Sequence, residues 1–225
     1  AVLCGRDALA GFDGDVAVLF ADTPLIRTGT LEAVFAALDG GANIAVLGFE
    51  PENPAGYGRL IENASGALTA IVEEKEASAE QKAVRLCNSG VMAAPAPLLF
   101  DLLSKVTNDN AKGEYYLTDI VALGVAAGHT ARAVRADADE VLGVNSRANL
   151  AEAEAAFQSR ARAAAMEAGV TLVAPGTVFF SFDTQIANDV IVEPNVVFGP
   201  GVRIETGAVI HAFSHLEGAH IGANA

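Results

Sequence analysis

The chain of 225 residues is 52% hydrophobic and carries a formal net charge of −14. Its length and apolar content are enough to bury a sizeable core in one large domain or two unequal ones, which excludes a disordered chain. The acidic charge and the scattered lysines and arginines exclude nucleic-acid binding, because affinity for a phosphate backbone comes from clustered basic side chains.

Three further features concern the compartment. The longest apolar stretch, residues 91–100, is short and contains Pro95 and Pro97, so no segment is predicted to cross a membrane. No signal-peptide pattern opens the chain, and Cys4 and Cys87 form no CxxC pair, which suits a reducing compartment. We therefore expect a cytoplasmic protein. Because residue 1 is alanine rather than an initiator methionine, we also expect that the natural start has been lost.

The first half of the chain alternates between strand and helix patterns. Residues 1–15 read as the tail of an amphipathic helix running into a Gly-Asp turn, and the apolar run over residues 15–21 predicts a buried central strand. Helical spacing over residues 28–38 and a second apolar run over 43–49 follow, and this alternation indicates an α/β sheet with right-handed crossovers. The same signals predict a hairpin over 58–62 and 67–74, strands over 86–93 and 131–135, and helices near 98–105 and 118–127.

The last third of the chain has a different period. Residues 146–170 are rich in Ala, Glu and Arg and predict one long connecting helix, with Ser146 as N-cap and Gly169 as the C-terminal stop. After this helix, large apolar residues recur every six positions, and the register slips by one residue at Ile221. Ordinary amphipathic strands alternate with period two, so this repeat predicts a parallel β-helix over residues 171–225. The residues expected to point into its interior are Ile186, Val192, Phe198, Ile204 and Ile210.

Asp22 is predicted to lie at the C-terminal end of a strand, where open α/β sheets bind their ligands. An ordinary Asp-Thr-Pro turn would explain the same residues, but other motifs follow in a fixed order. These are VLFADTPLI at 18–26, GYGRL at 56–60, IVEEK at 71–75, CNSGV at 87–91, GEYYLTD at 113–119 and VNSR at 144–147.

Together these motifs resemble the bacterial bifunctional UDP-N-acetylglucosamine pyrophosphorylase and glucosamine-1-phosphate N-acetyltransferase family, over essentially the whole chain. The resemblance implies an α/β, Rossmann-like nucleotidyltransferase domain over residues 1–145, the connecting helix over 146–170, and the start of a left-handed β-helix over 171–225. It also implies a homotrimer formed through the β-helix.

The same resemblance assigns the site residues. Asp22 and Asn145 would be the protein ligands of a magnesium ion, which prefers hard oxygen ligands and usually takes only one or two from protein. The residues that would bind UDP-N-acetylglucosamine are Phe20, Ala21, Asp22, Gly58, Glu73, Asn88 and Asn145, with Tyr116 and Thr118 as a possible acetamido pocket. Structural alternatives stay open: a solvated strand end for Glu73, a turn for Asn88, and a helix N-cap for Thr118.

The implied reaction is magnesium-dependent uridylyl transfer from UTP to N-acetylglucosamine-1-phosphate, giving UDP-N-acetylglucosamine and pyrophosphate. The whole enzyme would also acetylate glucosamine-1-phosphate with acetyl-CoA. The chain departs from the family in three ways: the glycine-rich phosphate loop and its lysine have no counterpart, position 21 is alanine instead of glycine, and the acetyltransferase residues would lie beyond Ala225. We therefore expect this chain to be inactive alone. His211, His215 and His220 do not match the acetylation base of the family, and we expect them at surface or stacking positions.

Two alternatives remain. The first is another sugar-1-phosphate nucleotidyltransferase with a β-helix tail, because the residues that read the base would lie mainly upstream of Ala1. The second is a non-catalytic trimerising module. The loss of the phosphate loop favours this module, whereas the presence of both Asp22 and Asn145 argues against it.

Overall fold

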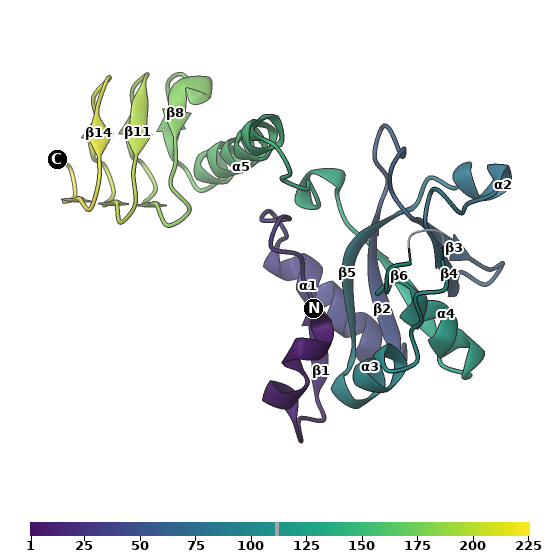
Figure 1. Cartoon of the computed structure of the whole chain (residues 1–225). Coiled ribbons are helices and arrows are strands. Elements are labelled where there is room, and N and C mark those ends of the chain that lie inside the picture. The colour runs from purple at the N-terminus through teal and green to yellow at the C-terminus, as the bar shows by residue number, and fades with distance from the viewer. Residues whose placement is uncertain (111–112) are drawn as a thin grey trace. The chain divides into compact units, whose positions relative to one another are not determined.

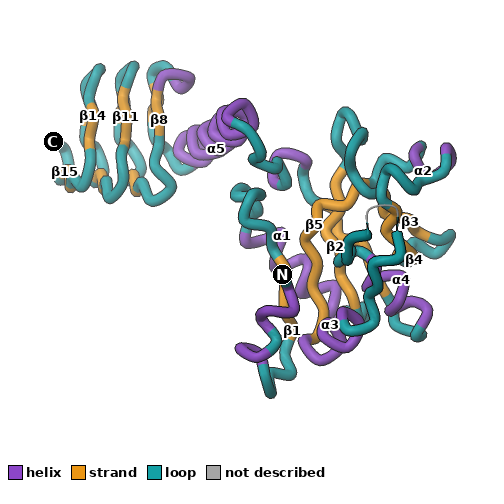
Figure 2. The backbone as a smooth tube through the Cα atoms, in the orientation of Figure 1, coloured by secondary structure: helices purple, strands orange, loops and turns teal. Residues whose placement is uncertain are grey.

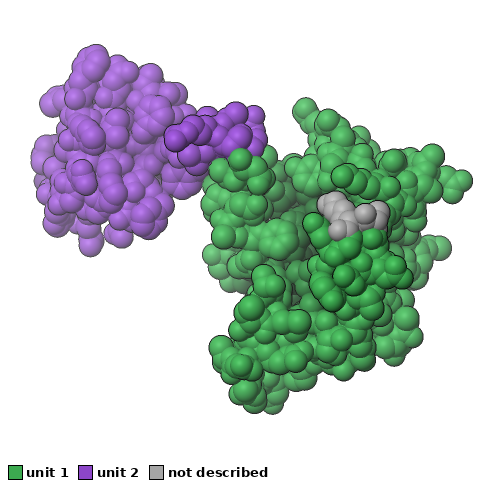
Figure 3. All heavy atoms as spheres, viewed as in Figure 1, with its two compact units in different colours: residues 1–145 green, residues 146–225 purple. Residues whose placement is uncertain are grey.

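The computed structural model describes residues 1–110 and 113–225, which form two compact units, Ala1–Asn145 and Ser146–Ala225 (Figure 3). None of the helices in the described ranges combines the length and the apolar character that a membrane span requires.

The first unit is built on a mixed six-stranded sheet with the order β1-β5-β2-β6-β4-β3 (Figure 1). Strand β2 is parallel to β6 and antiparallel to β5, which is in turn antiparallel to β1. The carboxyl ends of β1, β2 and β6 therefore lie at the same edge of the sheet as the start of β5. The strands are β1 (Asp15–Val18), β2 (Ile44–Phe49), β3 (Arg59–Glu62), β4 (Leu68–Val72), β5 (Cys87–Pro95) and β6 (Ala131–Arg135).

The prediction that residues 15–21 form a central strand is wrong for the described sheet. Strand β1 is shorter, ends at Val18 and lies at the edge of the sheet, with β5 as its one described neighbour. The buried central strand is β2, whose six residues are all buried. A short apolar run predicts that a strand packs against something, but it does not reveal how many strands flank it.

Helices cover both faces of this sheet because the side chains of β2 alternate between them. Ile44 and Val46 join the core beneath α3 and α4, whereas Ala45 and Leu47 join the core beneath α1. The helices are α1 (Thr28–Asp39), α2 (Ala79–Lys82), α3 (Ala96–Leu103) and α4 (Asp119–Ala126). Where the sequence predicted the tail of a helix, the chain forms two 3-10 turns, Val2–Gly5 and Asp7–Leu9.

The second unit begins with the long helix α5 (Arg147–Glu167), drawn in purple in Figure 2. The hydroxyl oxygen of Ser146 accepts a hydrogen bond from the backbone N–H of Asn149 (3.1 Å), and Gly169 has φ +91° just past the helix end. Both predicted helix boundaries are confirmed. The buried Gln158 side chain joins α5 to the β-helix, donating to the Phe180 carbonyl (2.7 Å) and accepting from the Phe180 N–H (2.9 Å).

The β-helix has three parallel faces, formed by the strand sets β7-β10-β13, β8-β11-β14 and β9-β12-β15. Stacked residues are eighteen positions apart, as in the pairs of Ile186 with Ile204 and Val192 with Ile210. The strands are β7 (Thr171–Leu172), β8 (Val178–Phe179), β9 (Gln185–Ile186), β10 (Ile191–Val192), β11 (Val196–Phe198), β12 (Arg203–Ile204), β13 (Val209–Ile210), β14 (His215–Leu216) and β15 (His220–Ile221).

The predicted interior is confirmed. Val192, Phe198, Ile204 and Ile210 are at most 5% exposed, and the partly buried Ile186 packs against them. The predicted slip is also confirmed, because Ile221 pairs with Ile204 only seventeen positions earlier.

The corners of the β-helix explain the slip. Residues with left-handed backbone angles recur every six positions, except for one step of five between Phe213 and Gly218. Glycine, asparagine and aspartate adopt such angles most readily, and they occupy every one of these corners except the one at Phe213, whose φ is 63°. The corner residues are Asp189, Asn195, Gly201, Gly207, Phe213, Gly218 and Asn224.

The three histidines of the β-helix are exposed, as predicted. The His220 ring lies 3.1 Å from a carboxylate oxygen of Glu205, and the His211 ring lies 3.4 Å from one of Glu193. The pKa of the Glu205 carboxyl is held below its ordinary value, chiefly by the His220 hydrogen bond and then by Arg203. Carboxylates and histidines thus link successive coils on the outside of the β-helix.

Candidate functional site

The residues that follow β1 form a tight turn at the edge of the sheet. Both the backbone N–H and the hydroxyl of the buried Thr23 donate to the Phe20 carbonyl, at 3.2 and 2.9 Å. The turn leaves Ala21 and Asp22 exposed to solvent. Asp22 is therefore free to face a ligand at this edge.

The segment that carries Asn145 crosses the same turn. The backbone N–H of Val144 donates to the carbonyl of Asp22 (2.8 Å), so Asn145 is the next residue along from this contact. Both Asp22 and Asn145 are exposed. Among the described residues no cluster of three or more His, Cys, Asp or Glu side chains could hold a metal. A carboxylate and an amide oxygen nevertheless fit Mg²⁺, which takes few ligands from protein.

A bulge follows Asn88 at the start of β5. The pairing of β5 with β2 shifts between Val46 and Gly48, and the Ser89 hydroxyl donates to the Leu47 carbonyl (2.7 Å) within the irregularity. The Asn88 side-chain oxygen accepts from the N–H of Gly90 (3.0 Å), so its amide nitrogen is the group that it can turn to a ligand.

Gly90 in this bulge supports the ring of Phe20. Gly90 has φ +90°, and a Cβ built on it would lie 2.1 Å from Cε2 of Phe20. The aromatic ring thus lies directly against the glycine backbone, and we call this contact the Phe20–Gly90 wall. Bulges often occur beside functional sites because they redirect a strand locally.

Gly58 connects Asn88 to Glu73 and Thr118 through a series of contacts. The N–H of Asn88 donates to the Gly58 carbonyl (2.8 Å), and a Cβ built on the buried Gly58 would lie 3.6 Å from Oε1 of Glu73. The Thr118 hydroxyl makes a long contact with the same oxygen (3.4 Å) and forms no helix cap on α4. Thr118 does occupy the N-cap position of α4, as the alternative predicted, but its side chain makes no cap bond. Glu73 is half-buried instead of a fully solvated strand end.

Tyr116, the other residue predicted for the acetamido pocket, lies three positions before the start of α4. It is half-buried, and its carbonyl accepts from the N–H of Asp119 (3.3 Å). The pKa of the Asp119 carboxyl is raised, first by burial and then by the charge of Glu76.

The sequence did not reveal the role of Arg59, the residue after Gly58. Arg59 is only 2% exposed, its guanidinium donates to the Tyr57 carbonyl and lies 3.6 Å from Glu74, and its Nε is buried without a partner. The Glu74 carboxylate also accepts from the N–H of Gly56. These contacts hold the loop before Gly58, so Arg59 is not free to bind a phosphate.

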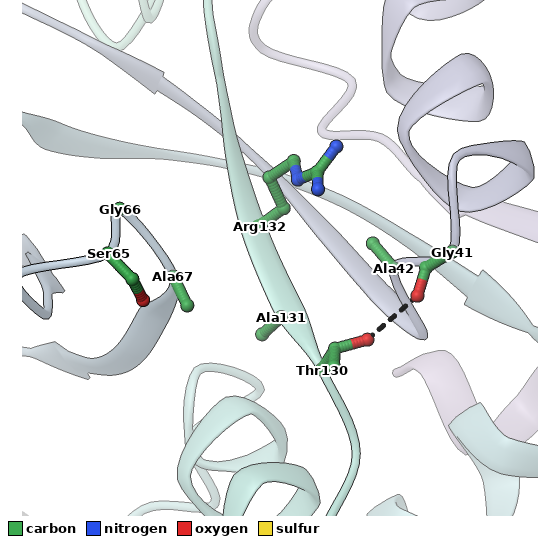
Figure 4. Close-up of a pocket in the computed structure, with 8 residues that line it drawn as sticks. All are labelled: Gly41, Ala42, Ser65, Gly66, Ala67, Thr130, Ala131 and Arg132. Carbon is green, nitrogen blue, oxygen red and sulfur yellow. Dashed lines mark hydrogen bonds between the residues drawn. The ribbon is translucent and has the colours of Figure 1, made fainter.

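Two of the cavities among the described residues of this unit are similar in size, and no predicted site residue lines either of these two. One, of about 260 Å³, lies at the carboxyl ends of β2 and β6 between Phe49 and Ala138. The other, of about 280 Å³, lies at the opposite ends of these strands (Figure 4). In this second cavity the Thr130 hydroxyl donates to the Gly41 carbonyl (2.9 Å), and Arg132 is the one charged lining residue.

Comparisons with known proteins agree with both units. Residues 183–218 match the family model "Bacterial transferase hexapeptide (six repeats)". A putative glucose-1-phosphate thymidylyltransferase from Bacillus anthracis is similar in fold, with a TM-score of 0.52 and 16% identity over 68% of this chain and 58% of that one. This likeness supports the Rossmann-like nucleotidyltransferase fold.

Curated relatives named "Bifunctional protein GlmU" match nearly the whole chain. The relative from Hyphomonas neptunium is 57% identical over 99% of this chain and 48% of its own length. That from Maricaulis maris is 66% identical over 83% of this chain and 41% of its own. The chain thus spans about half the length of the curated relatives that it matches. Over that span, the chain belongs to the transferase family of the bifunctional protein GlmU.

Proposed function

We propose that the Ala1–Asn145 unit contributes the sugar and metal sites for uridylyl transfer from UTP to N-acetylglucosamine-1-phosphate, which yields UDP-N-acetylglucosamine and pyrophosphate. In the whole protein a second activity would acetylate glucosamine-1-phosphate with acetyl-CoA. The observation that supports the first activity most is the meeting of five motifs, far apart in sequence, at one edge of the sheet. Their contacts connect Phe20, Asn88, Gly58, Glu73 and Thr118.

In this proposal each residue has a binding role that suits its surroundings. The ring of Phe20 offers a flat apolar surface to the nucleotide-sugar, and Ala21 lies beside it. The Glu73 carboxylate accepts from a sugar hydroxyl or the acetamido N–H, and the Asn88 amide nitrogen donates. A side chain at position 58 would enter the space next to Glu73, which explains glycine there. Tyr116 and Thr118 remain candidates for the acetamido pocket.

Asp22 and Asn145 would hold the magnesium ion through their side-chain oxygens. The ion, when bound, would neutralise phosphate charge that an acidic protein otherwise repels. Phosphoryl transfer depends mainly on positioning and charge neutralisation. The chain's own contribution is therefore the fixed spacing of the two segments, which the hydrogen bond from Val144 to Asp22 maintains.

For the second unit we propose assembly as a homotrimer through the β-helix. Apolar side chains lie exposed along its outer strands, including Phe179, Ile191, Val197 and Val209. A surface of this kind suits contact with further copies of the chain. The cytoplasmic location predicted from the sequence stays a prediction.

The proposal is tested by calorimetric titration of the chain with UDP-N-acetylglucosamine in the presence of Mg²⁺. We expect Glu73→Gln and Asp22→Asn each to weaken binding about tenfold or more, because hydrogen bonds to charged groups are worth about 1.5–3 kcal/mol. Glu62→Gln, a charge-matched change at the end of β3, should leave binding unchanged. Unaltered affinity in both site variants would refute the proposal, and equal affinity for UDP-glucose would favour another sugar nucleotidyltransferase.

Pyrophosphate release by this chain alone is expected to be negligible, since the family's phosphate loop has no counterpart in it. Among the basic residues near the matched motifs, Arg59 is buried against Glu74, Lys75 is exposed, and Lys112 lies outside the described residues. The matched comparison is the gene product extended at its N-terminus. Similar turnover by both proteins would show that the phosphate site is elsewhere.

A further inference from the structure

A buried carboxylate connects the two segments that carry Asp22 and Asn145. Glu140 ends a 3-10 turn (Ala138–Glu140), and its side chain is only 4% exposed. Its Oε2 accepts from the backbone N–H of Arg27 (3.1 Å) and from the Thr30 hydroxyl (2.6 Å), and its Oε1 lies 3.4 Å from Nε of Arg27. We call these contacts of Glu140 with Arg27 and Thr30 the Glu140 clasp.

The clasp fastens the start of α1 to the segment after β6. Arg27 is the N-cap residue of α1 and supplies no side-chain cap, and its own backbone N–H, one of the four at the helix N-terminus, donates to Glu140 from 113 positions away. The Arg27 guanidinium also lies 3.5 Å from Asp137 and 3.6 Å from Asp139. The 137–140 segment is thus held by charge, hydrogen bonding and burial together.

Two contacts, the clasp and the backbone hydrogen bond from Val144 to Asp22, join the segments that carry the proposed metal ligands. Arg27 follows Asp22 by five residues, and Glu140 precedes Asn145 by five. Between Glu140 and Asn145 the chain has no regular secondary structure, and the buried Val141 anchors the start of this stretch in the core beneath α1. Fixing the backbone of one flexible residue costs about 1–2 kcal/mol of conformational entropy. Where folding has already anchored the segment, this cost does not have to be met again when a cation binds.

Helix capping alone does not explain this arrangement. A glutamate or glutamine at position 30 would accept from the Arg27 N–H locally, as in a capping box, yet the acceptor comes from the segment that carries Asn145. A buried carboxylate also needs good partners to offset its desolvation, and Glu140 has three.

We propose that Glu140 is a positioning residue, which holds Asn145 next to Asp22 so that both can reach one divalent cation. This inference rests on the metal site of the proposed function. Replacing a residue that hydrogen-bonds a metal ligand directly typically changes metal affinity 10–100-fold, and Glu140, which acts through the backbone, should lie at the low end of that range.

The test is a titration of the chain with Mn²⁺ alone, followed by water-proton relaxation, beside thermal unfolding of each variant. Glu140→Gln keeps an acceptor for Arg27 N–H and Thr30 but turns an amide N–H toward Nε of Arg27, which is also a donor. We expect about tenfold weaker Mn²⁺ binding. Glu62→Gln removes the same charge from a carboxylate paired with Arg135 (2.9 Å) and should leave Mn²⁺ affinity unchanged.

A second pair of variants covers the case in which Glu140→Gln does not fold. Thr30→Val removes one hydrogen bond of the clasp and should weaken Mn²⁺ binding, whereas Thr30→Ser retains the hydroxyl and should restore it. Equal Mn²⁺ affinity of these two variants would overturn the inference.

Asp22→Asn distinguishes a failure of the positioning role of Glu140 from a failure of the proposed metal site. If Asp22→Asn leaves Mn²⁺ binding intact, the proposed metal site itself is wrong. If Asp22→Asn abolishes binding while folded Glu140→Gln binds Mn²⁺ like the unaltered chain, the site stands and the positioning role of Glu140 is wrong.

Discussion

Replacement of Gly90 by alanine should separate two effects at the Phe20–Gly90 wall. The first is backbone strain, because Gly90 has φ +90° and a side chain in that region costs about 1–2 kcal/mol. The second is a collision, because the new Cβ would lie 2.1 Å from the Phe20 ring. Since Phe20 is 44% exposed, its ring can swing outward and relieve the collision without distorting β5.

We therefore expect Gly90→Ala to lower the free energy of unfolding by little more than the strain, about 1–2 kcal/mol. Gly128→Ala is the matched control, because Gly128 has φ +88° and nothing lies within 4 Å of its added Cβ. The two variants should show similar losses in urea unfolding. A loss above about 4 kcal/mol for Gly90→Ala alone would mean that the ring cannot move.

Ligand binding should respond differently from stability. With the ring displaced, Gly90→Ala should weaken UDP-N-acetylglucosamine binding as much as Phe20→Ala does, about 3–10-fold for one aromatic contact worth 0.5–1.5 kcal/mol. The double variant should bind no more weakly than either single variant, and Gly128→Ala should bind normally. If Phe20→Ala weakens binding and Gly90→Ala does not, the role assigned to the wall is wrong.

Three further predictions concern stability and reactivity. Phe198→Ala should destabilise the β-helix unit by about 3–5 kcal/mol in urea unfolding, and the outward-facing Val197→Ala by less than about 1 kcal/mol; equal effects would contradict the packing. A thiol reagent should modify the exposed Cys4 quickly and Cys87 only on unfolding, because burial raises the pKa of the Cys87 thiol; two fast thiols would disprove this. The Glu205 carboxyl has a pKa lowered from 4.5, so its contribution is present above that value and lost as the pH falls. Acidification from pH ~5 to ~3 should therefore lower the unfolding temperature of Glu205→Gln less than that of the unaltered chain, and identical shifts would exclude the contribution.

The β-helix could be predicted in detail from the sequence because its information is local and repeated. A six-residue period fixes which residues face inward, and the structure confirms this for Val192 through Ile210. The missing residue at the Phe213 to Gly218 step was visible as a shift in the same period. The left-handed angle at Phe213 was not, because phenylalanine gives no signal for such a corner.

The first unit shows where such reasoning stops. The apolar run before Phe20 gave a strand, but its place at the edge depends on partners elsewhere in the chain. At Thr118 a local rule placed the start of α4 correctly, but the hydroxyl makes no cap bond because the fold brings Glu73 within its reach. Local propensity is a weak guide whenever a tertiary contact offers the same group another partner.

The candidate site divides in the same way. Ordered motifs identified residues that the structure does bring together around Asn88 and Gly58, and their binding roles remain predictions. The structural roles of Arg59 and Glu140 were not predicted. Their partners lie up to 113 positions away, and a single sequence contains no sign of such pairings.

The eighteen-residue coil gives the second unit a regular spacing along the axis of the β-helix. Each coil adds one strand to every face, and neighbouring strands are about 4.8 Å apart, so equivalent groups are separated along the axis by whole multiples of that interval. The distance along the axis between two outward-facing side chains can therefore change only when a complete coil is inserted or lost. Such distances would change in steps of one coil, whereas the omission of a single corner residue leaves the spacing between coils unchanged.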